Sequence, residues 1–367
     1  MDPYLFEKQC IFNNIILHNF TNKYFNNFPV ELIHIINILY VDVCDDPNLI
    51  TCTENYNIIR IKKNIHTFKN RIEGLKELAH NIKSNTNSFD IKDIKSFSSG
   101  KEYSMLLTLD GLYGYGNNGD GQLGVGNYDT RHVPRKVIFD KKIVSVTCGA
   151  YHTLVITETR QLYGCGCNDS GQLGLPICEY TYNVLTYCGL DSVIAVSCGK
   201  EHTMVLTKNG LYGFGSNGSL ELGIGNSINA YKPTKININN VISVHCGNEF
   251  TIVHTKNGTY TFGLNIYGEG ELYNTKPKLI KIQNITSIKC GYDYAIIQTK
   301  TTLYKLRAAN SGRYTNRPHQ IINIRDVISV GIGHNNCILM TKKNIYYLDD
   351  KINDSTINPF NLHQINL

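Results

Sequence analysis

A pattern that repeats with a period near 50 residues is the feature that most constrains this chain. Its best copy contains LYGYGNNGDGQLGVG, Leu112 to Gly126, preceded by a small residue, a glycine, an aromatic ring and a short apolar run. The copies stand 47, 49, 50, 48, 44 and 42 residues apart and begin at Thr53, Gly100, Gly149, Gly199, Gly247, Gly291 and Gly333. A fixed period of this length indicates an architecture built from similar small units.

Each unit is predicted to be a small β-sheet, because its apolar residues alternate in short runs rather than at helical spacing. One unit offers four strand candidates: PRKVI from Pro134, VSVTC from Val144, HTLVIT from His152 and LYGCG from Leu162. Four-stranded sheets repeated radially form a propeller, which covers its sheet faces against neighbouring blades.

The two ends of the chain suggest how the ring closes. The terminal run NPFNLHQINL, Asn358 to Leu367, is similar to the proline-led run ahead of other copies, and the first copy at Leu49 lacks such a run. We therefore expect an all-β fold: a seven-bladed β-propeller of four-stranded blades, closed by the C-terminal strand that completes the N-terminal blade. The propeller would occupy residues 46–367, after a short N-terminal helical segment at residues 1–45.

The runs CGxxHTxxxT and LYGxGxNxxGQLG resemble the regulator-of-chromosome-condensation repeat, over roughly Leu49 to Leu367. The motif is long and specific in residues 95–126 and 144–174, whereas Tyr304 is followed by KLRAANSGR instead of a glycine-rich turn. The resemblance implies the seven-bladed propeller. It also implies, from the family's founding member, a face that catalyses nucleotide exchange on the Ran GTPase, with Glu201, Glu249 and Asp293 as the acids here. The inserted wedge and the basic N-terminal tail of that member are absent from this sequence.

The segment before the repeats predicts one amphipathic helix, because apolar residues follow a proline at helical spacing. It resembles the opening helix of an F-box, which binds the Skp1-type adaptor of a ubiquitin ligase. The alternative is a helix that packs on the propeller, since the first blade leaves no room for further F-box helices. The residues of this candidate adaptor-docking helix are Pro29, Glu31, Leu32, Ile35, Ile36 and Leu39.

The candidate partner-binding residues follow the small-glycine pair, where the copies differ while their framework stays constant. Each pair is expected at the tip of a hairpin, so that the tips form a ring on one face, here called the tip ring. Its mixed charge and its tyrosines suit a protein partner and do not suit phosphates, which need a basic surface. The alternative is a set of solvated polar turns. The tip-ring residues are Glu54, Asn55, Lys101, Glu102, Tyr151, Lys200, Glu201, Asn248, Glu249, Tyr292, Asp293, His334 and Asn335.

Several motifs suggest catalysis or metal binding without being specific for it. Gly114 to Gly119 and Gly213 to Gly218 match the dinucleotide fingerprint, but no helical stripe follows the first, so we expect blade turns. His152 and His202 share a repeat position with Phe250, which indicates packing.

Cysteines are interpreted in the same way. Cys52, Cys148, Cys198, Cys246 and Cys290 share a position that Ser99 and Ile332 fill in other copies, which predicts core thiols. A zinc site of Cys165, Cys167, Cys178 and Cys188 is the alternative for the remaining thiols, at irregular spacing.

Composition limits the function further. The net charge of +6 is too mild and dispersed to indicate nucleic acid, although the stretch from Arg60 to Lys83 is basic and leaves chromatin binding as a third candidate. No secretory signal or membrane span is found, and we expect a reducing cytosol or nucleus. Abundant Asn, Ile, Lys and Tyr suggest an AT-rich genome, as in a giant virus. The prediction is a monomeric, non-catalytic protein-binding module without cofactor or metal, either an adaptor or an exchange factor for a small GTPase.

Overall fold

The computed structural model describes residues 50–52, 56–61, 64–69, 94–176, 179–266, 273–307, 319–321, 327–332, 336–341, 345–349 and 361–365. Residues 1–45, with the predicted adaptor-docking helix, lie outside the described residues. So do Glu54, Asn55, His334 and Asn335 of the tip ring, Cys178, and most of the basic stretch that ends at Lys83.

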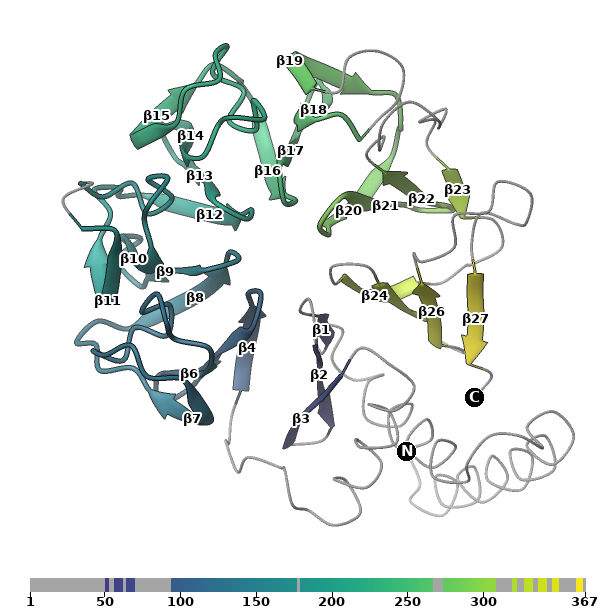
Figure 1. Cartoon of the computed structure of the whole chain (residues 1–367). Helices are drawn as coiled ribbons and strands as arrows, with labels where there is room; N and C mark the ends of the chain where they lie inside the picture. Colours follow the sequence, from purple (N-terminus) through teal and green to yellow (C-terminus); the bar gives the residue numbers. More distant parts are fainter. Residues whose placement is uncertain are drawn as a thin grey trace, which may run out of the picture.

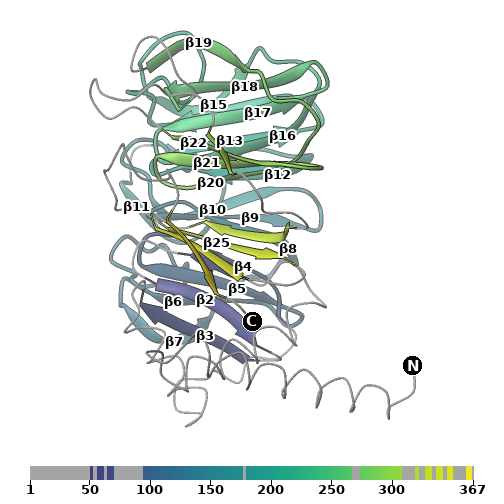
Figure 2. The same ribbon diagram turned by 90° about the vertical axis from the view of Figure 1, so that its right-hand side faces the viewer.

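The described chain is all-β, and its strands form one three-stranded and six four-stranded antiparallel sheets. Figure 1 shows these sheets arranged around a common centre, each with its first strand innermost. The view turned by 90° shows the strands running across the molecule between its two faces (Figure 2). The innermost strands of successive sheets are neighbours: β4 contacts β8, β8 contacts β12, β12 contacts β16, β16 contacts β20, and β20 contacts β24. Strand β1 contacts both β24 and β4.

The first four sheets follow one another along the chain. Their strands are β1 Ile50–Cys52, β2 Tyr56–Ile61 and β3 Asn64–Lys69; β4 Ile94–Ser99, β5 Tyr103–Thr108, β6 Leu112–Gly116 and β7 Arg131–Lys136; β8 Ile143–Cys148, β9 His152–Thr157, β10 Leu162–Cys167 and β11 Thr181–Tyr187; β12 Val193–Cys198, β13 His202–Thr207, β14 Gly210–Gly215 and β15 Ala230–Ile236. The remaining three continue in the same order. Their strands are β16 Val241–Cys246, β17 Phe250–Thr255, β18 Gly258–Leu264 and β19 Tyr273–Ile280; β20 Ile285–Cys290, β21 Tyr294–Thr299, β22 Leu303–Arg307 and β23 His319–Ile321; β24 Val327–Ile332, β25 Asn336–Thr341, β26 Ile345–Asp349 and β27 Asn361–Ile365.

The four predicted runs of one unit are all strands, and the second strand of each sheet forms its core. Strands β5, β9 and β13 are buried at every residue, because each has strands on both sides and a neighbouring sheet on each face. The β-branched and leucine side chains of HTLVIT suit this environment. The prediction of a repeated four-stranded unit is thereby confirmed for these sheets.

The proline-led run ends a sheet instead of opening the next one. Strand β7 pairs with β6, with Lys136 opposite Tyr113. In the same way β27 pairs with β26 in the last sheet, with Leu362 opposite Leu348. The expectation that the C-terminal strand completes the N-terminal sheet is therefore wrong. The outer edge of each third strand has backbone N–H and C=O groups that need hydrogen-bond partners. The proline-led run that follows in the chain reaches this edge through a shorter loop than a strand from the opposite terminus would need.

A ring at the start of the second strand fills the space between neighbouring sheets in five of the described sheets. The His152 ring lies over Gly149, where an added Cβ would be only 2.1 Å from the ring Cε1. The exposed fractions are 2% or less at Tyr103, His152, His202, Phe250 and Tyr294. Burial lowers the pKa of His152 and of His202 to about 3, so both imidazoles are neutral. The packing interpretation of both histidines is confirmed.

The repeated cysteine position is also a packing position. Cys148 and Cys246 are buried, while Cys198 and Cys290 are partly buried against the core. Cys148 Sγ donates to Ser98 O over 3.3 Å, and Cys246 Sγ makes the same contact with Ser197 O. Burial raises the pKa of the Cys148 thiol to about 11, which keeps it protonated.

Candidate functional site

The predicted hairpin tips lie where expected in the described copies. Gly149 N donates to His152 O over 2.8 Å and closes the turn between β8 and β9. The same bond closes the turns that begin at Gly100, Gly199, Gly247 and Gly291. Because these turns all follow an innermost strand, they lie on one face and near the centre of the ring of sheets (Figure 1).

Backbone hydrogen bonds join several of these tips to one another. Lys101 N donates to Ala150 O over 3.1 Å, and Lys200 N donates to Asn248 O over 3.2 Å. Asn248 N in turn donates to Tyr292 O over 3.0 Å. The tips are therefore held in a fixed order by main-chain contacts that do not depend on side-chain identity, which leaves their side chains free to vary.

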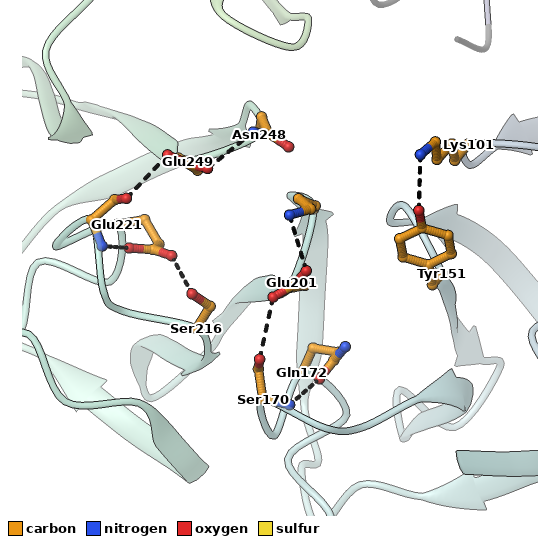
Figure 3. Close-up of polar contacts among 11 residues, drawn as sticks. Lys101, Tyr151, Ser170, Gln172, Glu201, Ser216, Glu221, Asn248 and Glu249 are labelled. Carbon is orange, nitrogen blue, oxygen red and sulfur yellow. Dashed lines mark hydrogen bonds and ion pairs between the residues drawn. The ribbon is translucent and has the colours of Figure 1, made fainter. Parts of the chain in front are cut away.

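The first described contact within the tip ring joins a cation to an aromatic ring. Lys101 Nζ donates to the Tyr151 hydroxyl over 3.0 Å and lies 5.5 Å from the ring centroid. Figure 3 shows this pair reaching across from two neighbouring sheets. A lysine that contacts both the hydroxyl and the ring orients the tyrosine.

The second contact centres on Glu201. Its carboxylate accepts from Ser170 Oγ over 3.3 Å and forms an ion pair with Lys200 Nζ over 3.2 Å. Burial alone would lower the pKa of Lys200, but the hydrogen bond and the negative charge of Glu201 outweigh it, so the pKa is raised. Ser170 lies in the glycine-rich loop between β10 and β11 of the preceding sheet, so its hydrogen bond with Glu201 links one sheet to the next.

A third set of contacts links Glu249, through Ser219, to the buried acid Glu221, which is not among the residues predicted from the sequence. Glu249 accepts from Ser219 Oγ over 3.1 Å and from Asn248 Nδ2 over 3.4 Å. Glu221 is 2% exposed and accepts from Ser216 Oγ over 2.7 Å and from Ser219 N over 2.8 Å. Burial first, and then the charge of Glu249, raise the pKa of Glu221 against these stabilising hydrogen bonds. Figure 3 shows the two carboxylates on either side of the same loop.

A sequence signal for Glu221 was present. The glycine-rich loops of the two preceding sheets carry glutamine at the position equivalent to Glu221. There Asp120 N donates to Gln122 Oε1, and Ser170 N donates to Gln172 Oε1. The third glycine-rich loop replaces this glutamine with an acid, and the replacement is visible when the copies in the sequence are compared.

The other two described acids of the tip ring, Glu102 and Asp293, also have partners. Glu102 accepts from Asn117 Nδ2 over 3.2 Å. Asp293 forms an ion pair with Arg307, whose Nε lies 3.3 Å from Oδ2. Arg307 lies opposite Tyr294 in the position that Gly116 occupies opposite Tyr103, so this pair is formed where the glycine-rich turn has been lost. The acids therefore stabilise the face on which they lie.

The described part of the tip ring is a fixed, mixed-charge surface with exposed aromatic area. Tyr292, after β20, is 41% exposed, and Glu102, after β4, is also exposed. In the part of the chain that the structure describes, no cluster of three or more metal-ligating side chains occurs. Such a surface can supply hydrogen bonds, ion pairs and tyrosine contacts to a protein, as binding hot spots do.

The other candidate motifs are structural. Gly116 and Gly215, the second glycines of the two apparent dinucleotide fingerprints, both have φ of +103° and end strands at blade turns. Within the described residues no helix follows either of them. Burial raises the pKa of Cys165 and of Cys188, which are neutral core thiols. No helix of the described residues is long and apolar enough to cross a membrane.

Comparison with protein families identifies the repeats. A family model described as the Regulator of chromosome condensation (RCC1) repeat matches residues 110–156, 161–206 and 208–253, and a second model of this repeat matches residues 143–172. The chain therefore contains RCC1 repeats, and they coincide with the sheets that carry the most regular glycine-rich turns.

Curated relatives match over short segments. The ultraviolet-B receptor UVR8 of Arabidopsis thaliana is 44% identical over 84 residues, which is 22% of this chain and 18% of the receptor. The probable E3 ubiquitin-protein ligase HERC4 of Homo sapiens is 39% identical over 64 residues, which is 17% of this chain and 6% of the ligase. The matched segments thus span less than a fifth of the length of these relatives.

Solved structures extend the likeness to most of the chain. Human WBSCR16 superposes with a TM-score of 0.63 at 20% identity, covering 80% of this chain and 85% of that one. Prp20p from Saccharomyces cerevisiae, a structure reported with its binding properties to Gsp1p and histones, gives a TM-score of 0.61 at 17% identity over 78% of this chain and 80% of its own. At these identities the likeness establishes the propeller-like fold.

Proposed function

We propose that this RCC1-repeat chain is a non-catalytic protein-binding module whose partner contacts the tip ring. The observation that carries the proposal is the contrast between a constant framework and variable tips. The backbone bonds that order the tips recur, whereas the side chains that they present include lysine, glutamate, asparagine and tyrosine. A surface whose chemistry differs at every blade recognises a partner of matching, asymmetric chemistry.

The proposed ring has seven blades. Its support is that β1 contacts both β24 and β4, while the other innermost strands are in contact in chain order. A closed ring fixes the spacing of the tips and leaves only short sheet edges. Closure in this arrangement needs no strand exchanged between the termini, because β27 belongs to the last sheet.

The specific form that we propose is a substrate-binding adaptor of a ubiquitin ligase. Residues 1–45 would dock a Skp1-type adaptor through Leu32 and Ile35, and the tip ring would hold the target. The F-box-like pattern of Pro29 to Leu39 supports this layout. We further propose that the chain is a monomer and works in the cytoplasm or nucleus, where buried thiols such as Cys148 stay reduced.

A second candidate is guanine-nucleotide exchange on a Ran-type small GTPase. It is favoured by the fold similarity to Prp20p, a structure reported with its binding properties to Gsp1p, and by the acids Glu201, Glu249 and Asp293 on one face. These acids already have intramolecular partners, Ser170, Ser219 and Arg307. Exchange would therefore require a GTPase to displace those contacts.

The test uses the full chain as bait in a plausible host lysate, with bound proteins identified by mass spectrometry. Three baits are compared: wild type, Tyr151→Ala with Tyr292→Ala, and Leu32→Asp with Ile35→Asp. We expect the target to be lost with the tyrosine variant only and a Skp1-type protein with the N-terminal variant only. A target that binds the tyrosine variant as well as wild type would rule out the tip ring.

The exchange candidate has its own measurement, the release of labelled GDP from a Ran-type GTPase. Exchange predicts that wild type accelerates release and that Glu249→Ala with Asp293→Ala abolishes the acceleration. Glu158→Ala, a substitution of an exposed acid in the turn between β9 and β10, is the matched control. Release at the intrinsic rate with wild type would reject exchange while leaving partner binding intact.

A further inference from the structure

The face opposite the tip ring carries a repeated β-bulge that no functional motif predicted. In six sheets the register of the innermost strand skips its second residue, as between Ile143 and Ser145 or between Val193 and Ala195. The same skip occurs in β4, β16, β20 and β24. A bulge leaves one residue unpaired and redirects its side chain.

Three consecutive sheets place a large aliphatic residue at this bulge, and each is exposed. Val144 is 41% exposed, Ile194 50% and Ile242 52%. The residue just before each of them is less exposed: Val193, which precedes Ile194, is fully buried. Because β8 contacts β12 and β12 contacts β16, the three side chains lie on neighbouring strands around the central axis. We name Val144, Ile194 and Ile242 the bulge patch.

Local backbone geometry fixes this arrangement. Ser192 and Asn240, which immediately precede the innermost strands, have φ of 55° and 57°, in the left-handed region. Their carbonyls accept from Lys208 N over 3.1 Å and from Lys256 N over 3.0 Å. Each bond ties the turn after the second strand of a sheet to the start of its first strand. The charged turn residues therefore lie beside the bulge patch.

Those turns make the surroundings of the bulge patch basic. The exposed cations at the turns and at the neighbouring bulge are Lys95, Arg160, Lys208, Lys256 and Lys300. Among the described residues, none of these five forms an ion pair. Two of the acids nearby are paired, Glu158 with Lys142 over 2.5 Å and Asp110 with Lys136 over 3.2 Å. The exposed Asp191 is the nearby acid without an ion pair among the described residues, so the five cations outnumber it.

We propose that the bulge patch and its basic turns form a second docking surface, which binds an acidic segment of a partner protein that carries large apolar side chains. The apolar side chains would cover Val144, Ile194 and Ile242, and the acidic ones would pair with the surrounding lysines and Arg160. Charge complementarity identifies this occupant, because the basic rim would repel a basic segment. A segment with acidic side chains alone would leave the aliphatic patch uncovered, so the segment must also carry apolar side chains.

Nucleic acid fits this surface less well. Phosphates would be attracted to the lysines, but bases are held by aromatic stacking, and neither the bulge patch nor the described turns that carry these cations contain an aromatic side chain. The proposed site is distinct from the tip ring, because the innermost strands begin at one face and end at the other. The proposal for the bulge patch can therefore be tested independently of the target proposed for the tip ring.

The experiment selects phage-displayed random linear peptides on the full chain and then measures the affinity of the enriched peptides by fluorescence anisotropy. We expect enrichment of peptides that combine Asp or Glu with Leu, Ile or Phe, and an affinity that falls as salt is raised. Ile194→Ser with Ile242→Ser is expected to weaken binding about tenfold or more. Lys208→Glu with Lys256→Glu is expected to weaken it to a similar extent.

The matched control is Ile138→Ser with Ile228→Ser, which removes two exposed aliphatic side chains, 88% and 70% exposed, that lie outside the bulges. It is expected to leave the affinity unchanged. All variants alter exposed side chains, and an unchanged thermal transition verifies their folding.

Three results would overturn the proposal: no enrichment of acidic and apolar peptides over the starting library, equal affinity for the Ile194→Ser with Ile242→Ser variant, or loss of binding in the control. A labelled DNA duplex provides the final comparison. If it binds the chain, loses affinity with Lys208→Glu and Lys256→Glu, and is indifferent to the bulge substitutions while the peptides fail to bind, the surface is a nucleic-acid site instead.

Discussion

His152 Nε2 lies 3.0 Å from Thr203 Oγ1, so that the ring that begins β9 is hydrogen-bonded to the next sheet. His202 makes the same contact with Thr251 over 3.1 Å. Where the ring is Phe250, the corresponding residue of the next sheet is Ala295, and the two share one apolar cluster. The polarity of the ring and that of its partner thus change together from one interface to the next.

This matching predicts coupling between the two partners. His152→Phe and Thr203→Ala should each destabilise the fold by about 1 kcal/mol or more. The first removes the bond between His152 Nε2 and Thr203 Oγ1, and the second also removes the bond that Thr203 Oγ1 donates to Gln172 O. The double substitution reproduces the Phe250 and Ala295 pair and should cost less than the sum of the two. Urea unfolding of the four proteins in a double-mutant cycle measures the difference. Strictly additive losses would show that the contact contributes nothing.

Acid should destabilise the fold through its two buried imidazoles. The native pKa of His152 and of His202 is about 3, below the ordinary value of about 6.5, so the unfolded chain binds more protons between these limits. Stability is unaffected by these groups at high pH and falls as the pH drops below about 6.5, by about 2 kcal/mol for each histidine at a pH of about 5.

The double variant His152→Phe with His202→Phe removes this dependence. We expect its stability between neutral pH and a pH of about 5 to fall less steeply than that of wild type, measured by urea unfolding. The exposed His132 supplies the control through His132→Gln. Parallel pH profiles for wild type and the double variant would contradict the buried neutral state.

Glu221→Gln should stabilise the chain at neutral pH. Burial and the nearby Glu249 raise the native pKa of Glu221, so the folded chain binds a proton more readily than the unfolded one. The native state therefore gains stability from this group at acidic pH and loses it as the pH rises through the raised pKa. Gln122 and Gln172 already show that the site accepts the amide.

The measurement for this prediction is the thermal transition at two pH values. Tm of Glu221→Gln should exceed that of wild type at neutral pH, and the difference should shrink when the pH approaches about 4, where the carboxyl is protonated. Glu158→Gln, which changes an exposed acid, is the control. A variant that melts below wild type at neutral pH would mean that the negative charge itself is required by the loop.

Gly166→Ala should destabilise the third sheet severely. Gly166 has φ of +104°, and an added Cβ would lie 2.4 Å from Tyr151 O and 2.7 Å from His152 Cα, where neither backbone atom can move freely. A loss of about 3 kcal/mol or more is expected. Gly218→Ala, at a glycine with open space around its Cα, should change stability by less than about 0.5 kcal/mol. Equal Tm values for the two variants would refute the strain argument.

The sequence by itself determined the repeated unit, its four strands and the location of its tips, because periodic glycines, aromatic residues and alternating apolar runs act locally. Comparison among the copies also identified His152, His202 and the shared cysteines as packing residues, since an exchange for Phe or Ser leaves no specific chemistry at those positions. These conclusions needed only the chemistry of neighbouring residues in the chain.

Only the tertiary structure decided which strand completes which sheet and which side chains meet across sheets. The proline-led run could pair forward or backward, and the observed pairing of β7 with β6 and of β27 with β26 depends on the free edge that the chain reaches first. The contacts of Glu201 with Ser170 and of Glu249 with Ser219 join residues 31 and 30 positions apart. Such contacts follow from how the sheets pack, because inter-sheet distances are set by the whole ring rather than by any one repeat.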